Sequence, residues 1–155
     1  MAECVMSRRE IQRMPTLAWS TPKSPPSGDG PVTVMASRLE LRRLSDVPSF
    51  LAAALRIRRQ MLASPGALGV SLIARPLYRT FWTLSAWQDQ AALSAAVGRE
   101  PHRQIMKRFR PRMTGSSFVT WTATGLPIPW DEALRRLEKP DTVHGRFRTI
   151  SGSVR

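Results

Sequence analysis

The sequence predicts an α+β fold in which a four-stranded antiparallel sheet packs against two helices. Three observations predict it. Four β-prone stretches alternate with two segments of helical period along the middle of the chain. Their order is β-α-β-β-α-β, and a further short helical segment follows. The chain has 155 residues, 42% of them hydrophobic, which is enough for one core but not for two full domains.

The first strand and the first helix are predicted at residues 32–41 and 46–62. The first range combines β-branched and aliphatic side chains, which favour an extended backbone. Ser45 or Asp46 precedes Pro48, the arrangement expected for a helix N-cap followed by a proline in the first turn. One side of the predicted helix is apolar and is expected to face the sheet: Val47, Phe50, Leu51, Ala54, Leu55, Met61 and Leu62.

The next two strands are predicted at residues 67–74 and 79–87, on either side of a turn at 75–78. The preceding Ser-Pro-Gly, residues 64–66, ends the first helix. Because the two strands are adjacent in sequence and joined by a short turn, we expect them to pair as a hairpin.

The last three elements complete the order. A helical region is predicted from 89 to about 113, with an interruption at Gly98 and a restart at Pro101. Residues 116–124 form the fourth predicted strand, and residues 130–138 form a short helix. This order is the ferredoxin-like split βαβ arrangement with an extra C-terminal helix.

The chain is expected to consist of one domain with two tails. Residues 1–31 include a Pro- and Gly-rich stretch at 21–31 and are predicted to be a disordered extension with a linker. The folded domain is predicted at 32–138. Residues 139–155 have few apolar positions and are predicted to be a flexible basic tail.

The net charge of +13, from 24 Lys plus Arg against 11 Asp plus Glu, raises the question of a nucleic-acid or anionic-membrane partner. The aromatic residues, however, lie on predicted strands with core-like patterning instead of among the basic residues. This pattern disfavours nucleic-acid binding and predicts that the basic residues of the second helical region form a solvated face. The densest cluster comprises Arg99, Arg103, Lys107, Arg108, Arg110 and Arg112.

Several classes of protein are excluded by what the sequence lacks. The single cysteine, Cys4, cannot form an internal disulfide, and no Cys/His cluster has the spacing of a zinc site. No apolar run approaches the length of a membrane span, and no phosphate-binding glycine loop or nucleophile motif is present. We therefore expect a cytoplasmic protein with no metal site and no membrane partner.

Both faces of the strand at 79–87 lack strongly polar side chains. Because one face of a two-layer domain would then be left uncovered, the pattern predicts a homodimer packed sheet to sheet. The sequence does not establish which set faces the helices. The two alternating sets are Phe81, Thr83, Ser85 and Trp87 on one face, and Trp82, Leu84 and Ala86 on the other.

Several runs of the sequence resemble a known superfamily. They are Gly69-Val-Ser-Leu-Ile-Ala-Arg-Pro-Leu77, Phe81-Trp-Thr-Leu-Ser-Ala-Trp-Gln-Asp89, Ala92-Leu93, and Pro101-His102 with Met106. These runs resemble the dimeric α+β-barrel superfamily, in particular an uncharacterised bacterial branch near the antibiotic-biosynthesis monooxygenases and spheroidene monooxygenase. The resemblance covers roughly residues 32–138. It implies a dimeric α+β barrel, but not one activity, because the superfamily includes cofactor-independent oxygenases, haem-dependent enzymes and proteins without demonstrated catalysis.

His102 is the strongest candidate for a functional side chain. It shares one face of its predicted helix with an apolar stripe, so its imidazole would act as a base or as a ligand to haem iron. The resemblance also implies such a role, since haem-binding members use a histidine in this helix region. The alternative is a structural histidine bonded to a backbone carbonyl. The stripe comprises His102, Ile105, Met106, Phe109 and Met113.

Two further groups are candidates for ligand contact. Phe81, Thr83, Ser85 and Trp87, together with Met106, would line a substrate pocket if the helices cover the opposite face of the sheet. The strand tryptophans Trp82, Trp87 and Trp121 otherwise serve as packing. Arg75 and Arg79 flank a turn and are either solvated or placed at a pocket mouth, where they would attract a carboxylate or a haem propionate.

Three functions remain after the sequence analysis. The first is a monooxygenase-like protein that acts on or binds an apolar or aromatic small molecule, with or without haem. The second is a non-catalytic ligand-binding or interaction domain of the same fold. The third is an arginine-rich nucleic-acid binder. No paired carboxylates or nucleophile–base pair are present from which a mechanism would follow.

Overall fold

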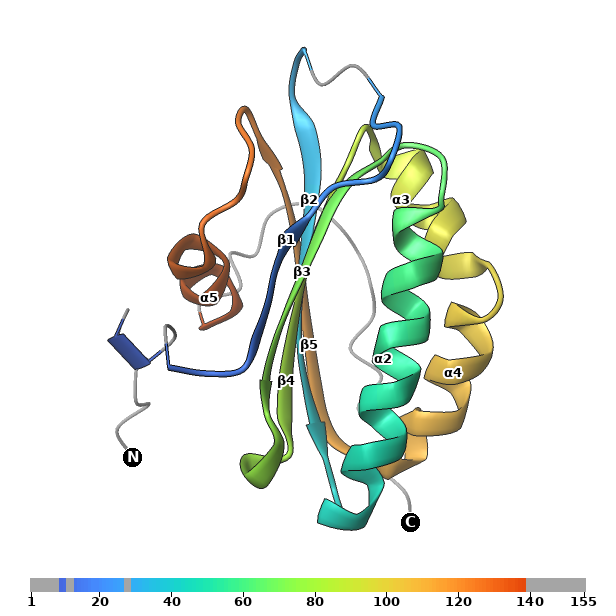
Figure 1. Ribbon diagram of the computed structural model, residues 1–155, viewed down its shortest axis with the longest axis vertical. Coiled ribbons are helices and arrows are strands. Elements are labelled where there is room, and N and C mark those ends of the chain that lie inside the picture. The colour runs from blue at the N-terminus through green and yellow to red at the C-terminus, as the bar shows by residue number, and fades with distance from the viewer. Residues whose placement is uncertain (1–8, 11–12, 27–28, 139–155) are drawn as a thin grey trace.

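The computed structural model describes residues 9–10, 13–26 and 29–138. These residues form five strands and the four helices α2 to α5, which single turns of 3-10 helix join in places (Figure 1). In chain order these elements are β1 (Thr16–Ser20), β2 (Val32–Leu41), η1 (Leu44–Asp46), α2 (Val47–Leu62), β3 (Ala67–Arg75), η2 (Pro76–Tyr78), β4 (Thr80–Trp87), α3 (Gln90–Gly98), α4 (His102–Phe109), η3 (Arg110–Arg112), β5 (Met113–Ala123) and α5 (Trp130–Glu138).

The sheet is antiparallel throughout, in the order β1-β3-β4-β2-β5. The strands β2 to β5 and the helices between them confirm the predicted ferredoxin-like arrangement. The predicted break between Gly98 and Pro101 separates α3 from α4. The helix α2 begins at Val47 with Pro48 in its first turn, as expected, although Asp46 makes no side-chain capping bond.

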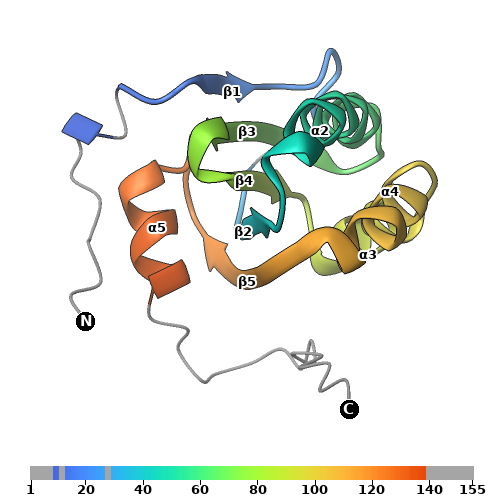
Figure 2. The same cartoon turned by 90° about the horizontal axis from the view of Figure 1, so that it is seen from below.

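Helices α2, α3 and α4 lie together on one face of the sheet, and α5 lies on the other (Figure 2). On the α2 side, strand β4 contributes Phe81 and Trp87 to two apolar clusters. The ring of Phe50 from α2 lies 4.6 Å from that of Phe81 and 5.2 Å from that of Phe109 on α4. This face therefore carries the main core of the domain.

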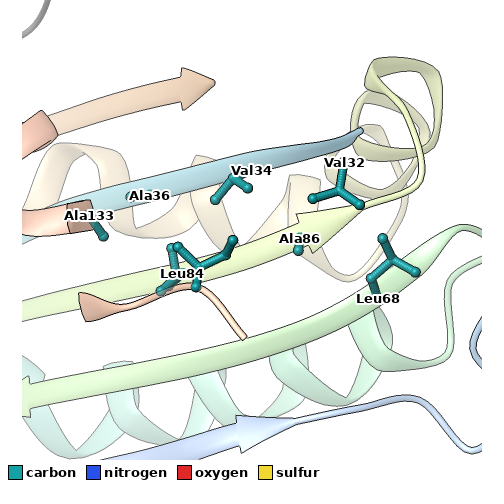
Figure 3. Packing of buried hydrophobic residues seen from close by; sticks show 8 residues of the cluster. Val32, Val34, Ala36, Leu68, Leu84, Ala86 and Ala133 are labelled. Carbon is teal, nitrogen blue, oxygen red and sulfur yellow. The ribbon is translucent and has the colours of Figure 1, made fainter. Parts of the chain in front are cut away.

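The sequence predicts that the opposite face of the sheet is left uncovered, but in the structure α5 covers it. Ala133 of α5 packs against side chains of β2, β3 and β4 that point away from α2 (Figure 3). Leu134, also from α5, packs against Ile73 and Trp82. Because α5 supplies this cover within one chain, the argument for a homodimer from a bare sheet face is wrong. The dimer itself stays a prediction.

Strand β1 is a fifth strand that the sequence analysis did not predict. It lies within the segment expected to be a disordered extension, and it pairs with β3 at the edge of the sheet. The hydroxyl of Ser71 donates to the carbonyl of Leu17, and the indole of Trp19 lies directly on Gly69. The expectation of disorder therefore does not hold for Thr16–Ser20, while the predicted tail at 139–155 lies outside the described residues.

No helix within the described ranges is both long enough and apolar enough to cross a membrane.

Candidate functional site

His102 lies at the start of α4, directly after the break that follows α3. Its Nδ1 atom is 3.1 Å from the carbonyl oxygen of Val97, the next-to-last residue of α3. Because a carbonyl oxygen can only accept a hydrogen bond, Nδ1 carries the proton. In that tautomer Nε2 holds a lone pair. The contact is the one expected for a structural histidine, and it also presents Nε2 as a base or ligand.

Gln60 of α2 fixes the junction on which His102 lies. Its Oε1 atom accepts a hydrogen bond of 3.0 Å from the backbone N–H of His102. Its Nε2 atom donates one of 2.9 Å to the carbonyl oxygen of Ala96. One side-chain amide thus satisfies an orphan N–H at the start of α4 and a carbonyl at the end of α3. The position of the imidazole is therefore set by three helices together.

The electrostatic setting of His102 favours the neutral imidazole. Burial lowers the pKa of His102 from its ordinary value of 6.5, and the hydrogen bond to the carbonyl of Val97 offsets part of this shift. At pH 7 the ring is therefore neutral, with Nδ1 protonated and Nε2 able to accept a proton.

Most of the side chains predicted to line a pocket face the helices and are buried. Phe81 and Trp87 belong to the clusters beneath α2, α3 and α4. Ser85 is buried and accepts a hydrogen bond of 2.9 Å from Nε1 of Trp87. The pocket prediction required the two main helical regions to cover the face of Trp82, but they cover the face of Phe81 and Trp87, and Trp82 packs against α5 instead. Phe81, Ser85 and Trp87 are enclosed between the sheet and the helices.

Thr83 is the exception within the predicted set. It is half-buried on β4, the central strand, where the other described residues are all buried. Its hydroxyl forms a hydrogen bond with that of Ser37 on β2. On the same face, Phe118 is exposed and Thr120 is half-buried on β5, the edge strand that pairs with β2. The helix layer is therefore incomplete over the part of the sheet where β4, β2 and β5 lie side by side.

Met106 lies one helical turn after His102 on α4 and is half-buried. Of the other members of the predicted stripe, Ile105 and Phe109 are buried in the cluster with Phe81. Met113 is not on the helix as predicted; it begins β5 and packs against the same cluster. The stripe is thus divided into a packed half and a half that reaches solvent. His102 and Met106 form the second half.

Arg75 and Arg79 lie at a different end of the molecule. Both flank η2, where Arg79 adopts φ 57° and donates from Nη1 to the carbonyl of Arg42. The guanidinium of Arg75 lies 4.2 Å from the ring centre of Tyr78. Arg42 is bonded through its N–H to Arg112, which follows the C-terminal end of α4. Since His102 begins α4, roughly 10 Å of helix separates it from this end.

A shallow hollow of about 270 Å³ lies beside α3 and was not predicted. The sequence signals that could have indicated it are the Ser-Pro-Gly stop and Asp89, which caps α3 by accepting a 2.7 Å bond from the N–H of Ala92. His102 is not part of its lining, which comprises Ser64, Pro65, Gly66, Gln88, Asp89, Ala92, Ala95, Ala96 and Arg99. Within the described ranges, no group of three His, Cys, Asp or Glu side chains is placed to hold a metal ion.

Comparison with known proteins places the fold. No protein-family model and no curated protein matches the chain. Among solved structures, a candidate monooxygenase from Fusobacterium nucleatum matches with a TM-score of 0.56 and 11% identity, over 68% of this chain and 48% of that one. A candidate antibiotic-biosynthesis monooxygenase from Nitrosomonas europaea matches with a TM-score of 0.53 and 13% identity, over 63% of this chain and 92% of that one.

A candidate monooxygenase from Lactobacillus acidophilus is also similar, with a TM-score of 0.53 and 12% identity over 69% of this chain and 51% of that one. The chain therefore spans about half the length of the Fusobacterium and Lactobacillus proteins. Its fold is the ferredoxin-like fold of antibiotic-biosynthesis monooxygenase-type proteins, as the sequence resemblance implied.

Proposed function

We propose that the chain is a monooxygenase-like protein that acts on or binds an apolar or aromatic small molecule, with His102 as its reacting group. The fold supports the monooxygenase-like class. The observation that carries the role of His102 is the bond between Nδ1 and the carbonyl of Val97, together with the lowered pKa. Both favour a neutral ring whose Nε2 can take a proton at pH 7.

The chemistry assigned to His102 is removal of a proton from a phenolic hydroxyl. The proton moves to Nε2 and leaves an electron-rich phenolate, which reacts more readily with O2 than the phenol does. The chain holds the ring of His102 in place through Val97, while Gln60 holds the backbone of the same residue. Holding the base in one orientation is how a protein lowers the cost of such a transfer.

The proposed place for the small molecule is between α4 and the uncovered part of the sheet. Thr83 and Met106 are the members of the predicted pocket that reach solvent. Phe81, Ser85 and Trp87 are buried on the same face and would support this place from below without reaching the ligand themselves. A mostly apolar surface with few hydroxyl groups suits an aromatic molecule that carries few polar atoms.

Haem is not supported by the described residues. The donor would suit iron, because a ligating histidine usually donates its other ring N–H to a carbonyl. The hollow beside α3, however, is not lined by His102, and Arg75 and Arg79 lie too far from His102 to bind the haem propionates. We therefore derive no step through haem. We expect a haem titration of the unaltered protein to give no shift of the Soret band. His102→Ala should therefore make no difference in this titration.

The experiment compares O2 uptake and ligand binding with 1,4-naphthohydroquinone as the probe. We expect His102→Ala to lower the enzyme-dependent rate of O2 uptake by about 100-fold or more, after subtraction of spontaneous oxidation. His144→Ala, which changes the other histidine of the chain, is the matched control. A rate unchanged by His102→Ala would refute the proposed base.

The second candidate function is a non-catalytic ligand-binding domain of the same fold. The structural contact between His102 and Val97 favours it, because that contact needs no catalytic purpose. It predicts that the probe quenches tryptophan fluorescence under anaerobic conditions and that no enzyme-dependent O2 uptake follows in air. The two measurements together distinguish the enzyme from the binding protein.

A further inference from the structure

Three turns from distant parts of the sequence meet at one end of the molecule. They are residues 42–46, 75–79 and 110–112, which we call the basic end. The N–H of Leu41 bonds to the carbonyl of Arg79 at 2.8 Å, and the N–H of Arg42 bonds to that of Arg112 at 2.8 Å. The basic end is the lower end of the molecule in Figure 1 and faces the reader in Figure 2.

The basic end concentrates positive charge. Its three turns hold six arginines and one acidic residue, Asp46. The carboxylate of Asp46 is already paired with Arg112 at 2.8 Å. The nearest acidic residue on β2, Glu40, pairs with Arg38. The acids near this end therefore leave an excess of positive charge facing solvent; the six arginines are Arg42, Arg43, Arg75, Arg79, Arg110 and Arg112.

The same turns carry the most exposed apolar side chains. Leu77 is 83% exposed, Tyr78 is 67% exposed and Leu44 is 52% exposed. These are the three highest values among the large hydrophobic side chains of the described part of the chain. An isolated exposed leucine needs no explanation. Three large apolar side chains at one end, surrounded by arginines, indicate an interaction surface.

We propose that the basic end docks on the surface of an anionic phospholipid bilayer. Arginine guanidinium groups pair with lipid phosphates, and protruding apolar side chains enter the boundary between headgroups and acyl chains. Leu77 and Tyr78 are adjacent on η2, and Leu44 lies on η1, so one approach presents all three. The docking needs no membrane-spanning helix. It departs from the expectation of no membrane partner.

Other occupants fit the basic end less well. A second copy of the chain would bring two surfaces of the same positive charge together, which costs energy. A single-stranded nucleic acid is typically held by aromatic rings on which its bases stack. The basic end offers one, Tyr78, whose ring already lies against Arg75, and its other two exposed apolar side chains are leucines.

The first experiment is co-sedimentation of the full chain with vesicles. Vesicles of phosphatidylcholine with 30% phosphatidylglycerol are compared with vesicles of phosphatidylcholine alone. We expect binding to the anionic vesicles only, weakening as salt is raised. The double variant Leu77→Ser, Tyr78→Ser should bind about tenfold more weakly. The matched control is Leu55→Ser, since Leu55 is 49% exposed on α2, away from this end.

The second experiment reverses charge. Arg43→Glu with Arg110→Glu is expected to weaken vesicle binding by roughly 30-fold or more. Arg56→Glu with Arg59→Glu, on exposed positions of α2, changes the net charge equally and should have a much smaller effect. An equal loss in both double variants would overturn the proposal. So would binding to a single-stranded RNA oligomer without binding to vesicles, which would assign the basic end to nucleic acid.

Discussion

The burial of the His102 imidazole makes the stability of the folded chain depend on pH. Because burial lowers the pKa of His102 in the folded chain, the unfolded chain binds the proton more readily below pH 6.5. The free energy of unfolding therefore falls as the pH drops from 6.5 through the lowered pKa of the folded state. Above 6.5 the ring is neutral in both states and contributes no slope.

We predict that His102→Gln flattens this part of the stability profile. Urea unfolding between pH 5 and 8 measures it, and the slope lost is at most about 1.4 kcal/mol per pH unit for one proton. Comparing the two proteins at pH 8 separates the constant cost of the lost contact with Val97 from the pH-dependent part. An identical slope in both proteins would mean that the pKa of His102 is not lowered.

Gly69 gives a second prediction at the scale of one residue. A methyl group at this position would collide with the indole of Trp19, which packs on the strand from β1. Gly69→Ala is therefore expected to lower the free energy of unfolding by about 1–3 kcal/mol, since two backbone strands must move apart. Gly98→Ala is the control because nothing lies within 4 Å of its added carbon. Thermal unfolding of both variants checks the difference; equal melting temperatures would show that β1 does not pack as described.

At the scale of elements, periodicity predicted the strands and helices between Val32 and Glu138 because each is long enough to show it. Strand β1 has only five residues beside a Pro- and Gly-rich stretch, and its pairing partner lies about 50 residues away. No local signal marks such a strand. The sequence also did not show which face of β4 lies against α2 and α4. Because α5 packs on the other side of the sheet, both faces of β4 are buried and apolar.

The candidate site shows the same limit. The stripe that contains His102 and Met106 followed from helical spacing, which is local. The contact with Gln60 joins residues 42 positions apart and had no signal in the sequence. For Arg75 and Arg79 the sequence left open a solvated turn or a pocket mouth, and the length of α4 separates both residues from His102. Chemistry-bearing residue types were thus identifiable, whereas their distances required the fold.

The role of α5 as a structural cover is testable. Leu134 is buried against Ile73 and Trp82. Leu134→Ala is expected to lower the free energy of unfolding by about 2–3 kcal/mol, at the low end for buried leucines because a helix at the edge of the core can relax. Leu126→Ala, at an exposed leucine on the loop before α5, should change it by less than about 0.5 kcal/mol. Chemical denaturation measures both, and similar losses would show that α5 is only loosely attached.

At the scale of the whole molecule, the charge of +13 affects every association of the chain. The sequence resemblance implies a homodimer, and four of the five tryptophans lie on the face of the sheet that α5 covers. Of these, Trp19, Trp121 and Trp130 are half-buried, so this face keeps apolar surface that a second copy would bury. We therefore predict a dimer through the α5 face at micromolar concentration, measurable by light scattering.

Salt separates this predicted dimer from the predicted docking at the basic end, because the two associations respond with opposite sign. Two copies that each carry +13 repel one another, so added salt screens the repulsion and strengthens the dimer. Docking of arginines on anionic lipid is an attraction, so the same salt weakens it. Light scattering and vesicle co-sedimentation between roughly 0.05 and 0.5 M NaCl, where screening of surface charges changes strongly, should therefore give opposite trends. The apolar contacts proposed at the α5 face do not weaken with salt. A dimer that weakens with salt would therefore depend on contacts between opposite charges, and the α5 face would not be its interface.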